Sequence, residues 1–444
     1  MIKPTISNDM MTGREYLESL MDGREIYIYG ERVINVVEHR AFRNSAYSLS
    51  KLYDALHDSS SQDTMTVVGS DGYRTHRYFM PSRSSQELLR ARDAIAHWSR
   101  LSYGFMGRTP DYKAGFTATL RSDPDLYAPF QDNANNWYEK SARKVLFLNH
   151  VLVNPPIGRA RQIANMRDIY LHVEKETDAG IIVRGVKMVA TSAALSNATF
   201  VAQNSATQHK VGSEEDFALC FILPMNAPHL KIMCRRSYEA SSLSPFDHPL
   251  SSRFDENDSV LIFDGVLVPW ENVLIYRDIE RARNFYSASG FLNRYPLQSG
   301  TRLAVKMDFI CGLLTKVLES NGASEFRGTH MRNLIIETTY QCIINTFGVS
   351  RNELQARYEH AQYSDFRTPG DVTDYIQIGI TLFKGRTLET KRKLYIAIST
   401  ALSELMYISP SSVLIVLDER EAENWGMRGG IPASEIDFGY SINI

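Results

Sequence analysis

The chain has 444 residues, of which 43% are hydrophobic and 23% charged, a composition typical of a globular protein with room for two or three domains. Its 49 basic and 51 acidic residues give a formal net charge of -2, which offers no support for binding nucleic acid or an anionic membrane surface. The longest apolar run, residues 217–225, is too short to span a membrane, and the first residues lack the apolar segment of a signal peptide. We therefore expect a cytoplasmic protein.

Residues 1–144 are predicted to form an N-terminal helical domain. Thr12 and Glu15 precede an apolar helical pattern with the spacing of a capping box, and Ser84 and Glu87 repeat that spacing. Each pair indicates the start of a helix.

Residues 145–282 are predicted to form a central β domain, because short β-branched runs alternate with turn signals. The runs are residues 180–183, 217–223, 230–233 and 259–263. A long polar connection at 203–216 is either a lid or a solvated surface loop.

Residues 283–444 are predicted to form a C-terminal helical domain, because the helical period returns there. The positions that share one apolar stripe are Leu303, Met307, Ile310, Leu314 and Val317. Four cysteines, at positions 220, 234, 311 and 342, lack CxxC spacing and are expected to be reduced and structural, and no metal site is expected.

The segment Arg108-Thr109-Pro110-Asp111-Tyr112 predicts a helix that begins with Thr109 as N-cap and Pro110 as first residue. Arg108 then lies just outside the helix and Tyr112 in its first turn, so both side chains and the positive end of the helix dipole can face one electron-rich atom, such as a phenolate oxygen. The alternative is that Arg108 caps a carbonyl and Tyr112 packs in the core.

His150 lies in an apolar, strand-like run, where a histidine is either a functional group or a core residue with satisfied hydrogen bonds. The sequence has no GxGxxG, GxxxxGK[ST], HExxH or GxSxG motif, so the usual signatures of dinucleotide, triphosphate, catalytic-zinc and serine-hydrolase sites are missing.

From about residue 10 to about 330 the chain resembles the oxygenase component of 4-hydroxyphenylacetate 3-monooxygenase, a family of reduced-flavin-dependent phenol hydroxylases. The matching segments are residues 28–33, 41–44, 106–113, 149–156, 174–180, 249–258 and 268–273. The resemblance implies an α+β, acyl-CoA dehydrogenase-like fold with an N-terminal helical domain, a central β domain and a C-terminal helical bundle.

The resemblance also implies the site residues. Arg108, Tyr112 and His150 are expected around the substrate hydroxyl as catalytic and substrate-binding groups, and Tyr295 as a further wall of the substrate pocket. The residues expected on the flavin side are Asn154, Pro155, Thr191 and Ser192. Without the resemblance, Thr191 and Ser192 are equally an ordinary strand end, and Tyr295 a core aromatic.

The function implied is a two-component monooxygenase that uses reduced FAD and O2 to hydroxylate a para-substituted phenol ortho to its hydroxyl. A separate NAD(P)H flavin reductase would supply the reduced FAD, and a homo-oligomer, dimer or tetramer, is expected. The alternatives are a halophenol monooxygenase, an acyl-CoA dehydrogenase-like or dehydratase activity, and a truncated homologue that binds flavin weakly.

The C-terminal region departs from the family pattern. Residues 340–400 match only loosely, and beyond Ser409-Pro410-Ser411-Ser412 the family continues into helices that this sequence does not show before Ile444. Gly158 stands where the family has an aspartate. We therefore expect a truncated C-terminal helical bundle, with consequences for flavin affinity and tetramer formation.

Overall fold

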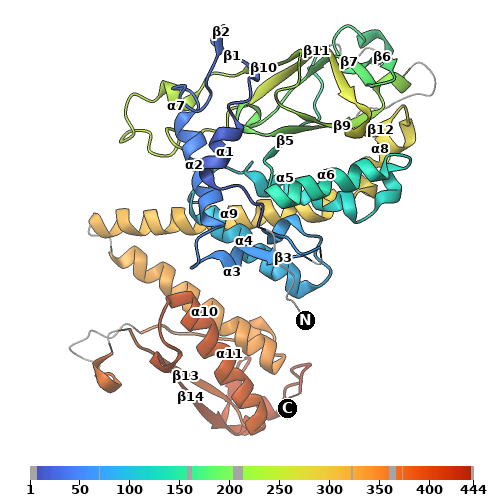
Figure 1. Ribbon diagram of the computed structural model, residues 1–444. Coiled ribbons are helices and arrows are strands. Elements are labelled where there is room, and N and C mark those ends of the chain that lie inside the picture. The colour runs from blue at the N-terminus through green and yellow to red at the C-terminus, as the bar shows by residue number, and fades with distance from the viewer. Residues whose placement is uncertain are drawn as a thin grey trace, which may run out of the picture. The chain divides into compact units, whose positions relative to one another are not determined.

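The structure is a computed structural model that describes residues 8–69, 71–157, 163–203, 214–321, 324–359, 367–372 and 374–441 (Figure 1). The chain divides into two compact units, one up to Cys311 and one from Gly312 onward. Most of the predicted loop at 203–216 lies outside the described residues, and so does Gly158.

The helices of the N-terminal region confirm the predicted helical starts. They are α1 (Gly13–Ser19), α2 (Arg43–Ala55), α3 (Gln62–Met65), α4 (Ser85–Arg100), α5 (Pro110–Thr117) and α6 (Gln131–Lys144). At α1 the capping box is complete, because Thr12 Oγ1 accepts from Glu15 N and the Glu15 carboxylate accepts from Thr12 N. At α4 Ser84 caps Glu87 N, whereas the Glu87 carboxylate accepts from Arg83 N instead.

Four short strands interrupt this helical region, and the sequence analysis did not predict these strands. β1 (Glu25–Ile28) and β2 (Glu31–Val33) form a hairpin, and β3 (Thr66–Val68) pairs with β4 (Arg74–His76). β1 also pairs in parallel with β10 (Leu230–Cys234), so the hairpin extends a sheet built mostly from much later residues. A strand whose partner lies about two hundred residues away leaves little local signal.

Two sheets form the central β region. The six-stranded sheet has the order β2-β1-β10-β11-β7-β6 and includes β6 (His172–Thr177), β7 (Gly180–Lys187) and β11 (Ser259–Pro269). The four-stranded sheet has the order β12-β9-β8-β5 and consists of β5 (Leu148–Val151), β8 (Ala198–Val201), β9 (Leu219–Pro224) and β12 (Val273–Tyr276). The strands predicted at 180–183, 230–233 and 259–263 are confirmed, and the one predicted at 217–223 begins at Leu219.

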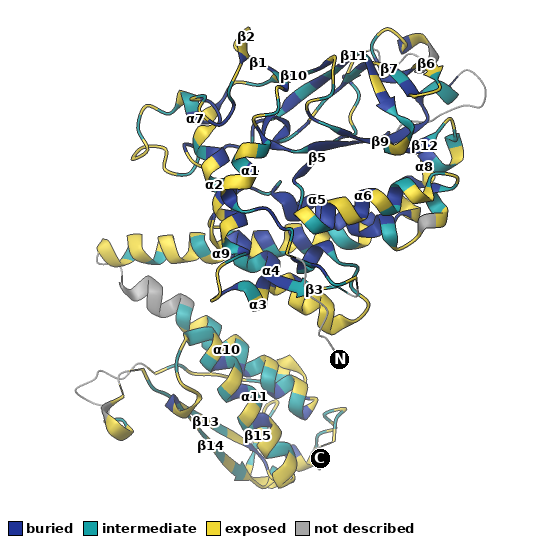
Figure 2. Ribbon diagram, viewed as in Figure 1, coloured by how far each residue is buried: buried dark blue, intermediate teal, exposed yellow. Residues whose placement is uncertain are grey.

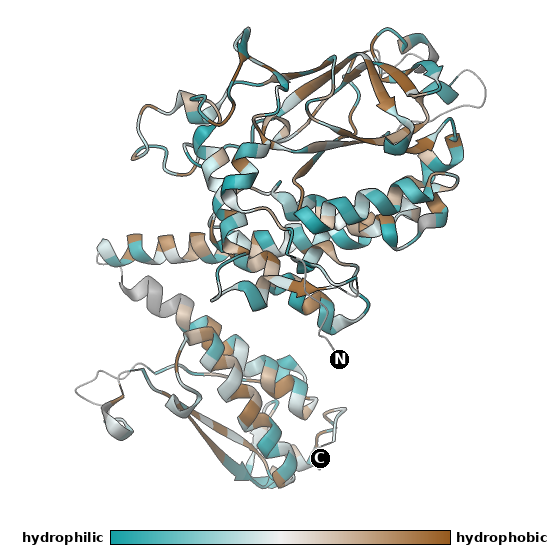
Figure 3. Ribbon diagram, viewed as in Figure 1, coloured by the Kyte–Doolittle hydropathy of each residue, from teal (hydrophilic) through white to brown (hydrophobic). Residues whose placement is uncertain are grey.

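The core of the first unit lies between these sheets and the helices below them in Figure 1. β8 and β9 are almost wholly buried, and Figure 2 shows the four-stranded sheet in dark blue. In Figure 3 β7 and β11 are brown over much of their length, whereas α6 is mainly teal because only its inner face is apolar.

Three helices follow the sheets: α8 (Ile279–Ala288), α9 (Phe291–Ser320) and α10 (Ser324–Phe347). The predicted helix over 303–317 is confirmed by α9. Its apolar stripe is not in the core, however, since Leu303, Met307 and Ile310 are 57%, 44% and 40% exposed. The buried side of α9 carries Gln298, Arg302 and Val305 instead.

The structure differs from the expected helical bundle beyond Phe347. In the second unit β13 (Ile376–Phe383) and β14 (Val413–Arg420) pair in parallel, with α11 (Leu388–Met406) between them in sequence. β15 (Gly426–Met427) and β16 (Ile431–Pro432) form a short hairpin. In β13 isoleucine alternates with smaller or polar residues, and β14 begins with a continuous apolar run that is rich in β-branched residues. Both patterns favour strands over helices.

None of the four cysteines, all of which the structure describes, is in a disulfide. Among the described residues, no helix combines the length and the hydropathy that crossing a membrane requires.

Candidate active site

The start of α5 has the predicted form. Thr109 is the N-cap with extended backbone angles, and Pro110 is the first helical residue. The preceding turn is held by the buried carboxylate of Glu256, which accepts hydrogen bonds from the backbone N–H groups of Gly107, at 2.9 Å, and Arg108. These bonds fix the position of the Arg108 backbone and therefore of its Cα.

The three residues predicted to surround a phenol oxygen lie together. The Arg108 guanidinium carbon is 4.1 Å from the centre of the Tyr112 ring, and the His150 ring is stacked on the same ring at 5.7 Å, with 27° between the planes. Among the described residues, the side chains of these three groups form no hydrogen bond with one another or with any neighbour. The described neighbours therefore do not use the side-chain donors and acceptors of these three residues.

The electrostatics of the triad follow from burial and from positive charge. Burial raises the pKa of Tyr112 above its ordinary value, although Arg108 opposes this shift. Burial, Lys113 and Arg108 together lower the pKa of His150 well below its ordinary value. The imidazole is thus neutral at neutral pH and has a nitrogen that can accept a proton.

Tyr295, predicted as a wall of the pocket, lies on α9 beside α5. Its ring stacks on Phe291 at 5.1 Å, and its Cα would be 3.6 Å from a Cβ built on Gly115. A Cβ at position 115 would make only an ordinary van der Waals contact with Tyr295, and Tyr295 lies close enough to Tyr112 to raise the pKa of that residue.

The residues predicted on the flavin side come from two segments that meet. Val153 and Met188 form an antiparallel bridge, in which Met188 N donates to Val153 O at 2.8 Å. The buried Lys187 ammonium donates to the carbonyls of Leu152 and Ala202, at 3.2 and 3.1 Å, and burial lowers its pKa to about 7. Asn154 and Pro155 therefore lie beside the segment that leads to Thr191 and Ser192.

These segments contain oxygen atoms that could accept hydrogen bonds from the polar edge of a flavin ring. The buried Asn154 Oδ1 has no hydrogen-bond donor among the described residues, although a buried acceptor normally has one. The Thr191 hydroxyl donates to Asp258 at 2.6 Å, which leaves its oxygen lone pairs as acceptors. Ser192 has a left-handed backbone (φ 61°), which turns the chain after the strand. The residues present thus fit the donor groups of a flavin ring.

A buried polar network behind the site was not predicted from the sequence. The Asp111 carboxylate pairs with Arg302 of α9 at 3.2 Å and accepts from Gln298 at 3.3 Å, while Gln298 also donates to Gly107 O. An acidic residue in the first turn of a helix looks like an ordinary dipole partner, so only the tertiary contact reveals this role.

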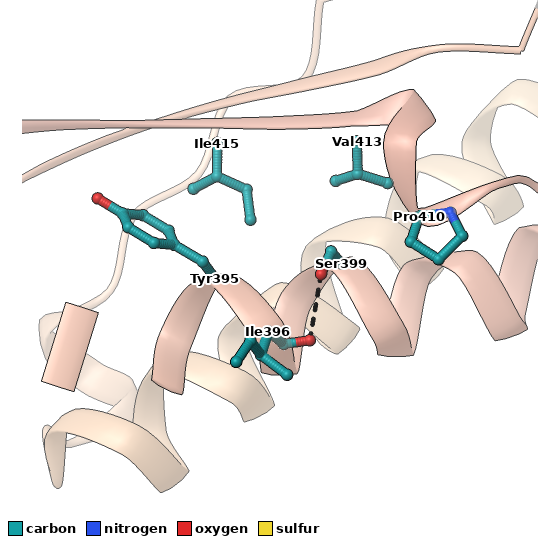
Figure 4. Close-up of a pocket in the computed structure, with 6 residues that line it drawn as sticks. All are labelled: Tyr395, Ile396, Ser399, Pro410, Val413 and Ile415. Carbon is teal, nitrogen blue, oxygen red and sulfur yellow. Dashed lines mark hydrogen bonds between the residues drawn. The ribbon is translucent and has the colours of Figure 1, made fainter. Parts of the chain in front are cut away.

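A distinct cavity lies in the second unit and is shown in Figure 4. It measures about 260 Å³ and is lined by α11, by the turn at Pro410 and by β14. The side chains that point into it are mainly apolar, and Ser399 is bonded to the Ile396 carbonyl at 3.2 Å. It contains none of the predicted site residues.

Comparison with known proteins separates the two parts of the chain. Residues 12–275 match the family model "4-hydroxyphenylacetate 3-hydroxylase N terminal" and residues 282–340 the model "4-hydroxyphenylacetate 3-hydroxylase C terminal". Residues 355–428 match the model "Tautomerase enzyme". The last match covers β13, α11 and β14, which is the region that departs from the expected bundle.

The chain is 52% identical over 324 residues to the pyoverdin chromophore biosynthetic protein PvcC of Pseudomonas aeruginosa, covering 73% of this chain and 65% of the relative. It is 53% identical over 323 residues to the 4-hydroxyphenylacetate 3-monooxygenase oxygenase component of Escherichia coli, covering 71% and 62%. The chain thus spans somewhat less than two thirds of these relatives.

Solved structures agree with these matches. The oxygenase component HpaB of 4-hydroxyphenylacetate 3-monooxygenase, complexed with FAD and 4-hydroxyphenylacetate, superposes with a TM-score of 0.68 at 31% identity, covering 78% of this chain and 72% of that one. An archaeal 4-hydroxybutyryl-CoA dehydratase shares the fold alone, with a TM-score of 0.62 at 17% identity over 75% of this chain and 68% of that one. The predicted acyl-CoA dehydrogenase-like fold is confirmed, and the chain belongs to the 4-hydroxyphenylacetate 3-hydroxylase family.

Proposed function

We propose that this protein is the oxygenase component of a two-component flavin-dependent monooxygenase, which hydroxylates a para-substituted phenol ortho to its hydroxyl. The observation that supports the proposal is that Arg108 and His150 both lie against the ring of Tyr112, with no side-chain hydrogen bond between these groups and any described neighbour. A phenol oxygen placed there would meet a cation, a hydroxyl donor and a proton acceptor.

Reduced FAD, when bound, would supply the activated oxygen atom. Asn154, Pro155, Thr191 and Ser192 are proposed to hold its ring, because the bridge between Val153 and Met188 brings their segments together and Asn154 Oδ1 lacks a donor. The sequence shows no GxGxxG motif for a nicotinamide cofactor. We therefore propose a separate NAD(P)H flavin reductase as partner.

The chain's own residues would act on the phenol. Neutral His150 accepts the phenolic proton, and Arg108 and Tyr112 stabilise the resulting phenolate by charge-assisted and hydroxyl hydrogen bonds. Ionisation enriches the ring carbon ortho to the oxygen in electrons, which is the carbon that must attack an electrophilic oxygen. The side chain of Tyr295 would form one wall of the pocket that holds the aromatic ring of the substrate.

The proposed substrate is a phenol of the 4-hydroxyphenylacetate type, since that compound is bound in the HpaB structure to which the chain is similar. A halophenol would undergo the same chemistry and is the alternative. We also propose a cytoplasmic homo-oligomer, a dimer or tetramer. The exposed Leu303, Met307 and Ile310 on one side of α9 support self-association, because a partner would remove this apolar stripe from water.

The test is an assay with a generic flavin reductase, NADH, FAD and a panel of phenols, in which mass spectrometry scores products that gain one oxygen. Arg108→Ala and His150→Ala should each lower the coupling of oxygen consumption to catechol formation by about tenfold or more. The exposed residues Arg14 and His248 offer matched controls, since Arg14→Ala and His248→Ala should leave coupling unchanged. Unchanged coupling in both site variants would refute the proposal.

A second activity is proposed for the second unit, because residues 355–428 match the tautomerase model. Arg386 is 6% exposed there, its Nη1 donates to Phe383 O, and its Nε has no acceptor among the described residues. An arginine with an unused donor suits a carboxylate. We propose that this unit moves a proton between carbon and oxygen in an enolisable 2-keto acid.

This second activity can be measured as the conversion of the enol form of phenylpyruvate to its keto form, followed by ultraviolet absorbance. Arg386→Leu should slow the conversion by at least about tenfold if the guanidinium orients the carboxylate. Conversion at the uncatalysed rate by the unaltered protein would exclude it.

A further inference from the structure

Lys113 is a buried lysine that has no part in the proposed function. It is 2% exposed on α5, directly after Tyr112. Its ammonium nitrogen lies 4.9 Å from the ring centre of Phe291, 5.2 Å from Tyr112, 5.5 Å from Phe200 and 5.8 Å from Phe116. Among the described residues it forms no hydrogen bond and no ion pair.

Among the residues that the structure describes, no carboxylate compensates the charge of Lys113. Five charged or titratable groups face it or its neighbour Tyr112. They come from the turn before α5 and from four elements: Arg108 before α5, His150 on β5, Cys220 on β9, Tyr286 on α8 and Tyr295 on α9. Burial and Arg108 lower the pKa of Lys113 well below its ordinary value, and the buried Cys220 thiol opposes this only in part. A lysine in such a place is readily uncharged and has a lone pair to accept a proton.

Lys113 shares its surroundings with the phenol site. Its nitrogen and the Arg108 guanidinium lie near the same Tyr112 ring on which His150 stacks. Phe200, part of the aromatic cage of Lys113, is the direct neighbour of His150 across the parallel pair β5 and β8. Lys113 and His150 therefore share two neighbours, Tyr112 and Phe200.

His150 by itself is a weak proton acceptor for a phenol. Burial and the charge of Arg108 hold its pKa well below the ordinary value, and a charged Lys113 lowers it further, so a proton would not remain on the imidazole. An imidazole can accept a proton at one nitrogen and release one from the other. The aromatic cage of Lys113, by contrast, favours a cation once a proton arrives.

We propose that Lys113 is the group that stores the phenolic proton, which reaches it through His150. This inference rests on the proposed function. In the step, the phenol O–H bond breaks, its electron pair stays on the oxygen, His150 passes on a proton, and the uncharged Lys113 amine becomes an ammonium. One phenolate and one ammonium form, so no net charge enters the buried site.

The probe is 4-nitrophenol, whose phenolate absorbs visible light whereas its phenol form does not. The full chain, with and without added FAD, is titrated at a pH where the free probe is mostly protonated. Absorbance reports ionisation of the bound probe, and calorimetry in buffers of different ionisation enthalpy counts protons released. The unaltered protein should bind the phenolate and release almost no proton, because Lys113 keeps it.

Two variants at position 113 separate proton storage from simple charge. Lys113→Met should lower the bound phenolate fraction about tenfold. Lys113→Arg, which stays charged, should still bind phenolate but release about one proton per probe. The exposed Lys51 provides a matched control, and Lys51→Met should behave as the unaltered protein does.

Stability gives a readout that distinguishes function from packing. Met fits an apolar cage better than an unpaired amine, so Lys113→Met should raise the melting temperature, whereas a lysine kept for structure would lower it. Full proton release by the unaltered protein, or an unchanged phenolate fraction in Lys113→Met, would overturn the role of Lys113 and leave the proposed function intact. Failure of the unaltered protein to bind the probe at any pH would overturn both.

Discussion

At the scale of single residues, burial decides which ionisable groups are charged. His76 illustrates this away from the candidate site. Its ring is fully buried, stacks on Trp98 at 4.2 Å, and accepts a hydrogen bond from Tyr78 N, and its Nε2 has no partner among the described residues. Burial lowers its pKa from 6.5 to about 4. A charged imidazole would be unfavourable in this position.

The consequence is a loss of stability in acid. Because the folded pKa lies below the unfolded one, the unfolded chain binds the extra proton between pH 6.5 and pH 4, and the free energy of unfolding falls across that window. For His76 the loss should approach about 3 kcal/mol at pH 4. Urea unfolding followed by tryptophan fluorescence at both pH values measures it. His76→Gln should show a smaller difference between the two, and an equal difference would contradict this account.

At the scale of elements, a buried ion pair helps to fix the position of α5 relative to α9. Arg302 bonds the Asp111 carboxylate and also the Met106 carbonyl, the latter at 2.9 Å. Gly104, with φ +77°, lies so close to the backbone of Lys306 that a Cβ there would clash. The turn that carries Arg108 is therefore held by α9 on one side and by Glu256 on the other.

Removal of one partner of the Asp111–Arg302 pair should lower the free energy of unfolding. Asp111→Ala leaves the Arg302 guanidinium buried without its counter-charge, so the first unit should lose about 3–5 kcal/mol of stability. The double variant Asp111→Leu/Arg302→Met should lose less than the sum of the two single changes, because it leaves no unpaired charge. Denaturant unfolding of the four proteins completes the cycle, and strict additivity would show that the two residues do not interact.

At the scale of the whole molecule, the chain combines two units with separate cores. The second unit has its own cluster of buried side chains, in which Leu394, Ile398 and Leu402 of α11 are fully buried. Its two-stranded parallel sheet has an outer face on which Leu414 and Val416 remain 41% and 47% exposed. The core of this unit is small, which predicts lower stability than that of the first unit.

Calorimetry should therefore resolve two unfolding transitions. Ile398→Ala should lower the stability of the second unit by about 2–5 kcal/mol and shift only the transition at lower temperature. The upper transition, and the coupling of phenol hydroxylation, should not change. A shift of both transitions by the same amount would indicate that the units unfold together.

The sequence by itself determined the local elements and indicated the residues of the candidate site. The capping residues Thr12 and Thr109, the proline at 110 and the alternating strands act over a few neighbouring residues, so their signals can be found in the sequence. The convergence of Arg108, Tyr112 and His150 was predicted through resemblance, and the structure places the three together.

Only the tertiary structure decided the rest. Lys113 in a helix normally faces solvent, and nothing nearby in sequence predicts that Phe200 and Phe291 enclose it. Asp111 forms an ion pair with Arg302, which lies almost two hundred residues later in the sequence. β1 pairs with β10 at a similar separation. The parallel pairing of β13 with β14 joins strands that α11 separates in sequence, so it is not visible in either strand alone. Contacts between residues far apart in sequence decide which side chains are buried and which are charged. Short stretches of sequence do not reveal these contacts.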